Sequence, residues 1–370
     1  IPSTVTVIDK YAFCLCQSLK SITIPDSVEI INDGAFFGCS QLTQITIPNS
    51  VKSIGSHVFS RCSSLNQILI PSSVPLLKDD SFIECSKLSK VTMDIYKTNI
   101  ENSTFIKCDM LTNLTFDSTV TSIQRYDFNK FPKLTTIVIP SSCSSIDDNV
   151  FEDCSLLTSI TIPNSVKTIG KSAFKNCSSF TSISLPNSIV TIGECAFKGC
   201  SSLTQMGIPA SVTEIGVQGF AECSSITQIT IPNSITTIKQ YTFYNCTSLN
   251  QVTIQNTVKD IEDGAFYGCS QLKQITFPNE ITKIANYVLY GCKSITSISI
   301  PNSVTSIGQN SFAGCSSITS ISIPNELTSI DDGAFNGCSS LTQIVIPNSV
   351  SIIYNSTFKN CSKLAQLTID

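Results

Sequence analysis

The sequence predicts an α/β solenoid, a stack of sixteen coils that share a parallel β-sheet, and three observations support this prediction. The 370-residue chain realigns on itself every 23 residues, so that sixteen copies end at residue 368. Each copy holds alternating apolar residues, the period of a strand with one buried face. One copy cannot bury its own apolar edge, whereas stacked copies share a continuous core. A fixed period of this kind overrides the two or three globular domains that the chain length suggests.

We number the positions of each copy from 1 to 23, starting at Ile1. Apolar residues at positions 19, 22 and the following 1, as in Leu42, Ile45 and Ile47, predict a strand. Proline follows at position 2 in thirteen copies and ends the strand, because it has no N–H to donate. A turn then leads to a second extended stretch at positions 4–8. Positions 11–15 predict one helical turn, with Phe at position 13 in fifteen copies as the main core residue.

The repeated pattern L-x-x-I-x-I-P-x-S-V-x-x-I-x-x-x-A-F-x-x-C resembles the leucine-rich repeats of BspA-like surface proteins of oral and gut bacteria and of protists such as Trichomonas and Entamoeba. The resemblance covers the whole chain. It implies a leucine-rich repeat, right-handed superhelix with its parallel β-sheet on the concave face. It also implies a cell-surface or extracellular protein that adheres to host cells or matrix proteins. The motif residues are all core residues, so the resemblance assigns no binding residue here.

Composition excludes several classes of function. The formal net charge is −4, and no basic excess is present to attract a nucleic acid. The apolar runs are only a few residues long, so we expect no direct membrane insertion of this segment. We expect residues 1–370 to form a single leucine-rich repeat domain. Because the chain opens in mid-pattern and carries no signal peptide, we expect it to be a segment of a longer protein.

Cysteine follows the repeat. Fifteen of the eighteen cysteines stand at position 16, one in each coil except the copy that has Phe131. A replacement by a larger apolar residue is typical of a buried packing site, so the sequence predicts a column of reduced core thiols. The other thiols are Cys14, Cys143 and Cys195, of which we expect Cys143 to be buried and Cys195 to be the most reactive.

Catalytic and metal-binding residues are not indicated. His57, the single histidine, falls on an outward turn, and a hydrolytic triad would need it beside a nucleophile and an acid. Acidic pairs recur at positions 9 and 10, as in Asp147-Asp148, Glu262-Asp263 and Asp331-Asp332. They lie in separate coils without the spacing of a calcium-binding loop, which favours solvated turns. We therefore predict a non-catalytic protein with no metal and no cofactor.

Binding is predicted on the outward side chains of the strands, at positions 20, 21 and 23. Thr, Gln and Ser dominate there, and the charged residues are Lys20, Lys90 and Lys273. Such a surface suits hydrogen bonding to a protein or glycan, although Thr is also simply a favourable residue for a soluble strand. Regularity breaks over residues 71–138, which marks the first place to look for a binding patch. The predicted binding residues are Thr43, Gln44, Gln67, Leu69, Lys90, Thr112, Thr135 and Val138.

The function favoured by these observations is an adhesion module that binds a host or matrix protein or glycan along the concave sheet. Two alternatives remain open. Coils that stack end to end by self-association would form a filament or surface coat. An intracellular protein-interaction scaffold fits the reduced thiols equally well.

Overall fold

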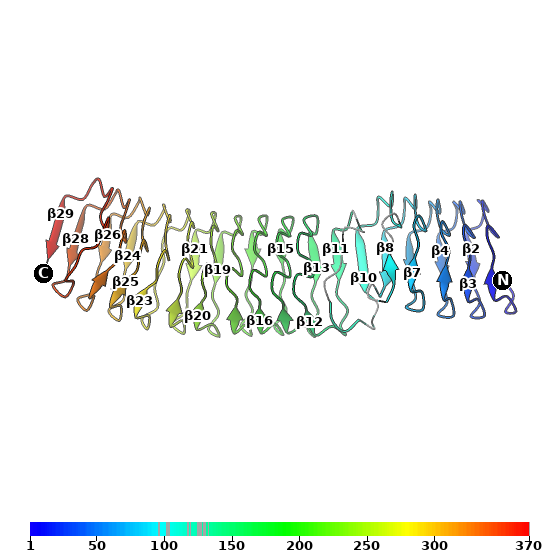
Figure 1. The fold of residues 1–370 in the computed structure, drawn as a ribbon, viewed down its shortest axis with the longest axis horizontal. Helices are drawn as coiled ribbons and strands as arrows, with labels where there is room; N and C mark the ends of the chain where they lie inside the picture. Colours follow the sequence, from blue (N-terminus) through cyan, green and yellow to red (C-terminus); the bar gives the residue numbers. More distant parts are fainter. Residues whose placement is uncertain are drawn as a thin grey trace. The chain divides into compact units, whose positions relative to one another are not determined.

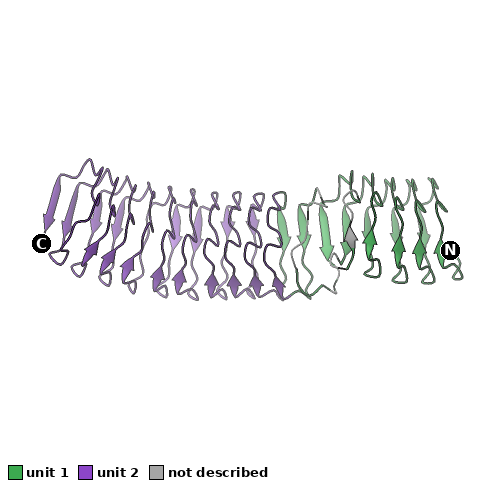
Figure 2. Cartoon of the chain, in the orientation of Figure 1, with its two compact units in different colours: residues 1–143, 156–163 green, residues 144–155, 164–370 purple. Residues whose placement is uncertain are grey.

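The chain forms a parallel β-solenoid in which each coil adds about 23 residues (Figure 1). The computed structural model describes residues 1–94, 97–100, 104–116, 118, 120–123, 128, 131 and 133–369. These residues form strands and turns and include no α-helix, and hence no helix that could cross a membrane. Two compact units are present (Figure 2): unit 1 comprises Ile1–Cys143 and Leu156–Pro163, and unit 2 comprises Ser144–Ser155 and Asn164–Asp370.

One column of parallel strands contains positions 21–23 of the coils. Their register shifts by 23 residues from coil to coil, as in Ile22 opposite Ile45. Position 22 points into the core and positions 21 and 23 point outward, as expected for a half-buried strand. In unit 1 these strands are β2 (Ser21–Thr23), β4 (Gln44–Thr46), β6 (Gln67–Leu69), β8 (Lys90–Met93), β10 (Asn113–Phe116), β11 (Thr136–Val138) and β13 (Ser159–Thr161). In unit 2 they are β15 (Ser182–Ile183), β17 (Gln205–Met206), β19 (Gln228–Thr230), β21 (Gln251–Thr253), β24 (Ser297–Ser299), β26 (Ser320–Ser322), β28 (Gln343–Ile346) and β29 (Gln366–Ile369).

A second column of two-residue strands lies at positions 7 and 8, where the sequence predicts the second extended stretch. Its position-8 residue is buried in the core, as at Ile31 and Ile192. In unit 1 these strands are β1 (Val7–Ile8), β3 (Ile30–Ile31), β5 (Ser53–Ile54), β7 (Leu76–Leu77) and β9 (Asn99–Ile100). In unit 2 they are β12 (Ser145–Ile146), β14 (Thr168–Ile169), β16 (Thr191–Ile192), β18 (Glu214–Ile215), β20 (Thr237–Ile238), β22 (Asp260–Ile261), β23 (Lys283–Ile284), β25 (Ser306–Ile307) and β27 (Ser329–Ile330).

The helical turn predicted at positions 11–15 is wrong. Every described residue at positions 11 and 15 has a positive φ, as in Gly34 at +61° and Gly38 at +70°. A left-handed residue every fourth position cannot continue an α-helix. Instead, main-chain N–H groups at positions 11, 13 and 15 donate to carbonyls of the next coil, as Phe13 does to Ala35 at 2.7 Å. This third row of inter-coil hydrogen bonds replaces the hydrogen bonds that a helix would make internally.

The core contains the predicted phenylalanine column. Phe36, Phe174, Phe197 and Phe220 are fully buried, and successive rings stack with centroids 5.2–5.8 Å apart. Phe131, which replaces cysteine, also joins the stack: its ring lies 5.3 Å from that of Phe105. The prediction that position 13 forms the core is therefore confirmed in most described coils, but Phe13 and Phe358 are only half-buried, so the expectation that every ring of the column is buried is wrong at these two.

The position-16 thiols form the predicted column, and most of them donate a hydrogen bond to a main-chain carbonyl of the coil before. The Sγ of Cys39 donates to the carbonyl of Phe13 at 3.1 Å, and the same bond recurs down the stack. Burial raises the pKa of Cys39 to about 11 and that of Cys62 to about 12, which makes both thiols poor nucleophiles. No disulfide joins the described cysteines.

Two expectations about individual thiols need correction. Cys16 belongs to the column but is exposed. Cys195, expected to be the most reactive, is half-buried, and burial followed by the charge of Glu194 raises the pKa of its thiol. Cys143 is fully buried, as predicted.

Candidate binding wall

The outward side chains at positions 20, 21 and 23 form the surface that we call the strand wall. Position-21 residues are exposed in most coils, as Gln44, Gln205 and Gln251 are. Many position-20 threonines are partly engaged: the hydroxyl of Thr43 donates to the carbonyl of Lys20 at 3.3 Å, and Thr204 bonds Thr181 in the same way. Some of the position-20 hydroxyls therefore form hydrogen bonds between coils. The exposed amides at position 21 are the groups more available to a ligand.

A hollow of about 290 Å³ opens on the strand wall of unit 1. It is lined by β4, β6 and β8, and its residues include Gln44, Gln67, Leu69, Lys90 and Thr92. The Leu69 side chain is 46% exposed, an apolar group where most coils have threonine. The hollow thus combines amide groups, one cation and one exposed apolar side chain.

The structure brings together half of the predicted binding residues. Gln44, Gln67, Leu69 and Lys90 line the unit 1 hollow. The others do not line it, although each lies on the strand wall of unit 1: Thr43, Thr112, Thr135 and Val138. The hydroxyl of Thr135 also donates to the carbonyl of Thr112, at 3.4 Å.

The irregular stretch 71–138 contains residues that lie outside the described part of the chain. They are residues 95–96 of the MDIYKTNI segment, Pro132, and residues 101–103, 117, 119, 124–127 and 129–130. The described strands β8, β10 and β11 keep the regular parallel register. Two residues that differ from the usual repeat residue, Lys90 within this stretch and Leu69 just before it, line the unit 1 hollow.

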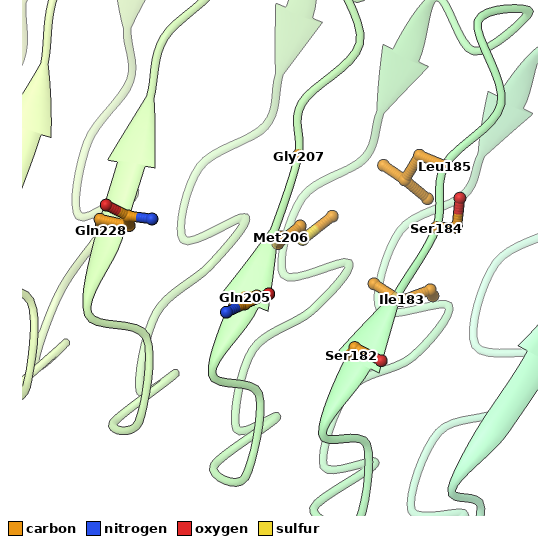
Figure 3. A pocket seen from close by; sticks show the side chains of 8 residues that line it. All are labelled: Ser182, Ile183, Ser184, Leu185, Gln205, Met206, Gly207 and Gln228. Carbon is orange, nitrogen blue, oxygen red and sulfur yellow. The ribbon is translucent and has the colours of Figure 1, made fainter.

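A second, larger hollow lies on the strand wall of unit 2, outside the stretch that the sequence singled out. Its volume is about 450 Å³, and Figure 3 shows its lining. The lining residues come from three neighbouring coils: Ser182, Ile183, Ser184, Leu185, Gln205, Met206, Gly207 and Gln228. The signal that could have revealed it is Met206-Gly207, where the repeat has an aliphatic residue followed by Thr, Ser, Val or Leu.

One group of side chains resembles a hydrolytic triad in composition only. His57 Nδ1 lies 3.5 Å from the Ser60 hydroxyl, and His57 Nε2 lies 4.0 Å from Asp80 Oδ2. The sequence does not indicate this arrangement, because the three residues come from two coils. Ser60 is fully buried, and its hydroxyl donates to the main-chain carbonyl of Asp80. A substrate cannot reach that oxygen, so the group lacks an accessible nucleophile.

The acidic pairs, predicted to be solvated turns, take part in the stacking of coils. At position 10, the carboxylate of Asp148 accepts the main-chain N–H of Lys171 at 2.7 Å, and Asp263 accepts that of Asn286 at 3.1 Å. These bonds link equivalent positions of successive coils. No cluster of three or more potential metal ligands occurs within the described part of the chain.

This architecture, parallel strands at a 23-residue spacing around an aliphatic and phenylalanine core, defines a leucine-rich repeat protein, a class that generally serves as protein-interaction modules. The model of the "BspA type Leucine rich repeat region (6 copies)" matches residues 1–111, 77–179, 167–296 and 282–370. The chain belongs to this family.

One solved structure agrees with this assignment, and a second is similar in sequence. A leucine-rich repeat protein from Bacteroides ovatus is 26% identical with a TM-score of 0.57, over 99% of this chain and 88% of that one. A leucine-rich cell surface protein from Faecalibacterium prausnitzii is 28% identical with a TM-score of 0.42, over 95% of this chain and 88% of that one. No curated protein matches the chain.

Proposed function

We propose that the chain is a non-catalytic adhesion module, displayed on a cell surface, that binds a protein or glycan of a host or its matrix along the strand wall, the face predicted to be concave. The observation that supports this proposal most is the unit 1 hollow. Two departures from the repeat, Leu69 for Thr and Lys90 for Gln or Ser, lie at its rim. Exposed apolar side chains beside a cation and amides are typical of a contact surface.

The test restores the repeat at the hollow. In Leu69→Thr/Lys90→Gln, both side chains revert to residues that other coils carry at these positions, so the fold should be unaffected. Beads coated with either protein are applied to epithelial monolayers and to cell-derived matrix, and the attached beads are counted. We expect attachment by the double variant to fall at least tenfold.

The matched control removes a positive charge elsewhere. Lys52 lies outside the strand wall and pairs with Glu29 at 3.1 Å, so Lys52→Gln should leave attachment unchanged. Equal attachment by the wild-type protein and the double variant would reject the proposal that this hollow is the binding site. Failure of the wild-type protein to attach to either surface would reject adhesion itself.

A further inference from the structure

Gly207 is a glycine that neither backbone conformation nor packing requires. Its φ does not lie in the left-handed region that favours glycine, and a Cβ built on it would meet no atom within 4 Å. Gly193, by contrast, has the main chain of the preceding coil only 2.6 Å from such a Cβ. Glycine beside a strand lowers stability relative to Thr and often marks a place where another backbone approaches closely. The missing side chain at position 23 therefore points to access from outside.

The carbonyl of Gly207 has no main-chain partner in the neighbouring coils. β17 pairs with β15 through Gln205 and Met206, and no N–H of a neighbouring coil donates to the carbonyl of Gly207 within the fully described stretch 133–369. At the equivalent position of another coil, the carbonyl of Thr253 accepts the N–H of Ile231 at 2.9 Å. A main-chain carbonyl without a partner can accept a hydrogen bond from an N–H of an extended peptide.

The hollow beside Gly207 has an apolar floor and an uncharged rim. Ile183, Leu185 and Met206 are 7–8% exposed, and Figure 3 shows the side chains of Leu185 and Met206 directed toward one another. Gln205 and Gln228 supply amides at the rim, and no lining residue carries a charge. Methionine is flexible and adapts its shape to different contacts. The volume of about 450 Å³ falls in the range of roughly 300–1,000 Å³ that ligand sites occupy.

We propose that this hollow is a peptide-binding subsite that takes a neutral, extended segment of a partner protein, with one apolar side chain on the floor and its main chain against Gly207. The assignment rests on the proposed function, since it specifies a ligand for the same strand wall. The uncharged rim excludes selection by an acidic or basic side chain. The lining residues include no aromatic ring on which a sugar could stack, which favours a peptide over a glycan.

The test uses the methionines as reporters. The chain has three: Met206 in the hollow, and Met93 and Met110, which lie in unit 1 and serve as internal controls. The protein is labelled with ¹³C in its methionine methyl groups, and Met206→Leu identifies the Met206 signal. The probe is acetyl-Ser-Leu-Ser-amide, with acetyl-Ser-Asp-Ser-amide and lactose titrated in parallel. We expect the leucine peptide to shift the Met206 signal saturably, with a dissociation constant in the millimolar range, and to leave the other two signals in place.

Gly207→Thr restores the repeat and fills the hollow, and we expect it to weaken the leucine peptide at least tenfold. Ser299→Thr is the matched control, since it adds one methyl group at position 23 of a coil in the same unit that does not line the hollow. The proposal is overturned if the leucine peptide produces no saturable shift, binds Gly207→Thr equally well, or binds no better than the aspartate peptide. A response to lactose alone would assign the hollow to a glycan instead. If the protein attaches to cells but the leucine peptide does not shift the Met206 signal, only the subsite proposal is rejected. If the peptide binds but the protein does not attach to cells, only the adhesion proposal is rejected.

Discussion

Truncation of one ring in the phenylalanine column should loosen a few coils and leave distant ones intact. Phe197 is fully buried, and its ring is stacked between Phe174, at 5.3 Å, and Phe220, at 5.4 Å. Phe197→Ala removes the transfer free energy of the ring and both stacking contacts and leaves a cavity, which costs about 3–5 kcal/mol. Phe197→Leu is the matched variant, because Leu289 occupies the same position of another coil, and it should cost only about 1–2 kcal/mol.

Hydrogen exchange measured by mass spectrometry is the appropriate assay, since a long repeat array does not unfold in one cooperative step. A loss of 3–5 kcal/mol corresponds to exchange that is roughly 150 to 5,000 times faster. We expect this acceleration in peptides from residues 174–220 and little change in residues 297–346 of the same unit. Equal acceleration in both segments would refute nearest-neighbour stacking. An acceleration below tenfold at 174–220 would show that the ring contributes far less than its burial indicates.

Three further predictions concern thiols, glycines and a carboxylate. A thiol reagent added to native protein should modify Cys16 at once and leave Cys223 untouched, because burial raises the pKa of Cys223; equally fast labelling of both would contradict the thiol column. Gly193→Ala should lower the thermal midpoint of unfolding by several degrees, because its methyl group would meet main-chain atoms at 2.6 Å. Gly207→Ala should leave the midpoint unchanged or raise it, because the space around it is open. The reverse order would show that coil spacing adapts freely. The carboxylate of Asp33 accepts the main-chain N–H of Ser56, which holds the pKa of this carboxyl below its usual value of 3.8. Its stabilisation is therefore fully present above pH 3.8 and is lost as the pH falls through the lowered pKa of the folded protein. Asp33→Asn keeps the acceptor oxygen and should lose less of its thermal midpoint between pH 7 and pH 3 than the wild-type protein; an identical loss in both would mean that this bond contributes nothing to the pH dependence.

The 23-residue period by itself determined most of the fold. Apolar alternation at position 22 and the proline at position 2 located the strands, and the recurrence of Phe at position 13 in fifteen copies located the core. Such predictions succeed because stacking places equivalent residues in contact, so that each column reports one environment sixteen times. For the same reason the replacement of cysteine by Phe131 correctly indicated a buried site.

Tertiary structure decided what depends on the neighbouring coil. The Ala-Phe pair at positions 12 and 13 reads as helical, yet hydrogen bonds to the next coil hold positions 11 and 15 in the left-handed region. Cys16 follows the thiol pattern and is nevertheless exposed, whereas Cys39, whose Sγ donates to the carbonyl of Phe13, is buried. Gly207 shows the same dependence. Within the sequence it is one glycine among sixteen, and only the open space around its Cα and the apolar floor beside it distinguish it from a glycine that close packing requires, since that difference lies in atoms contributed by other coils.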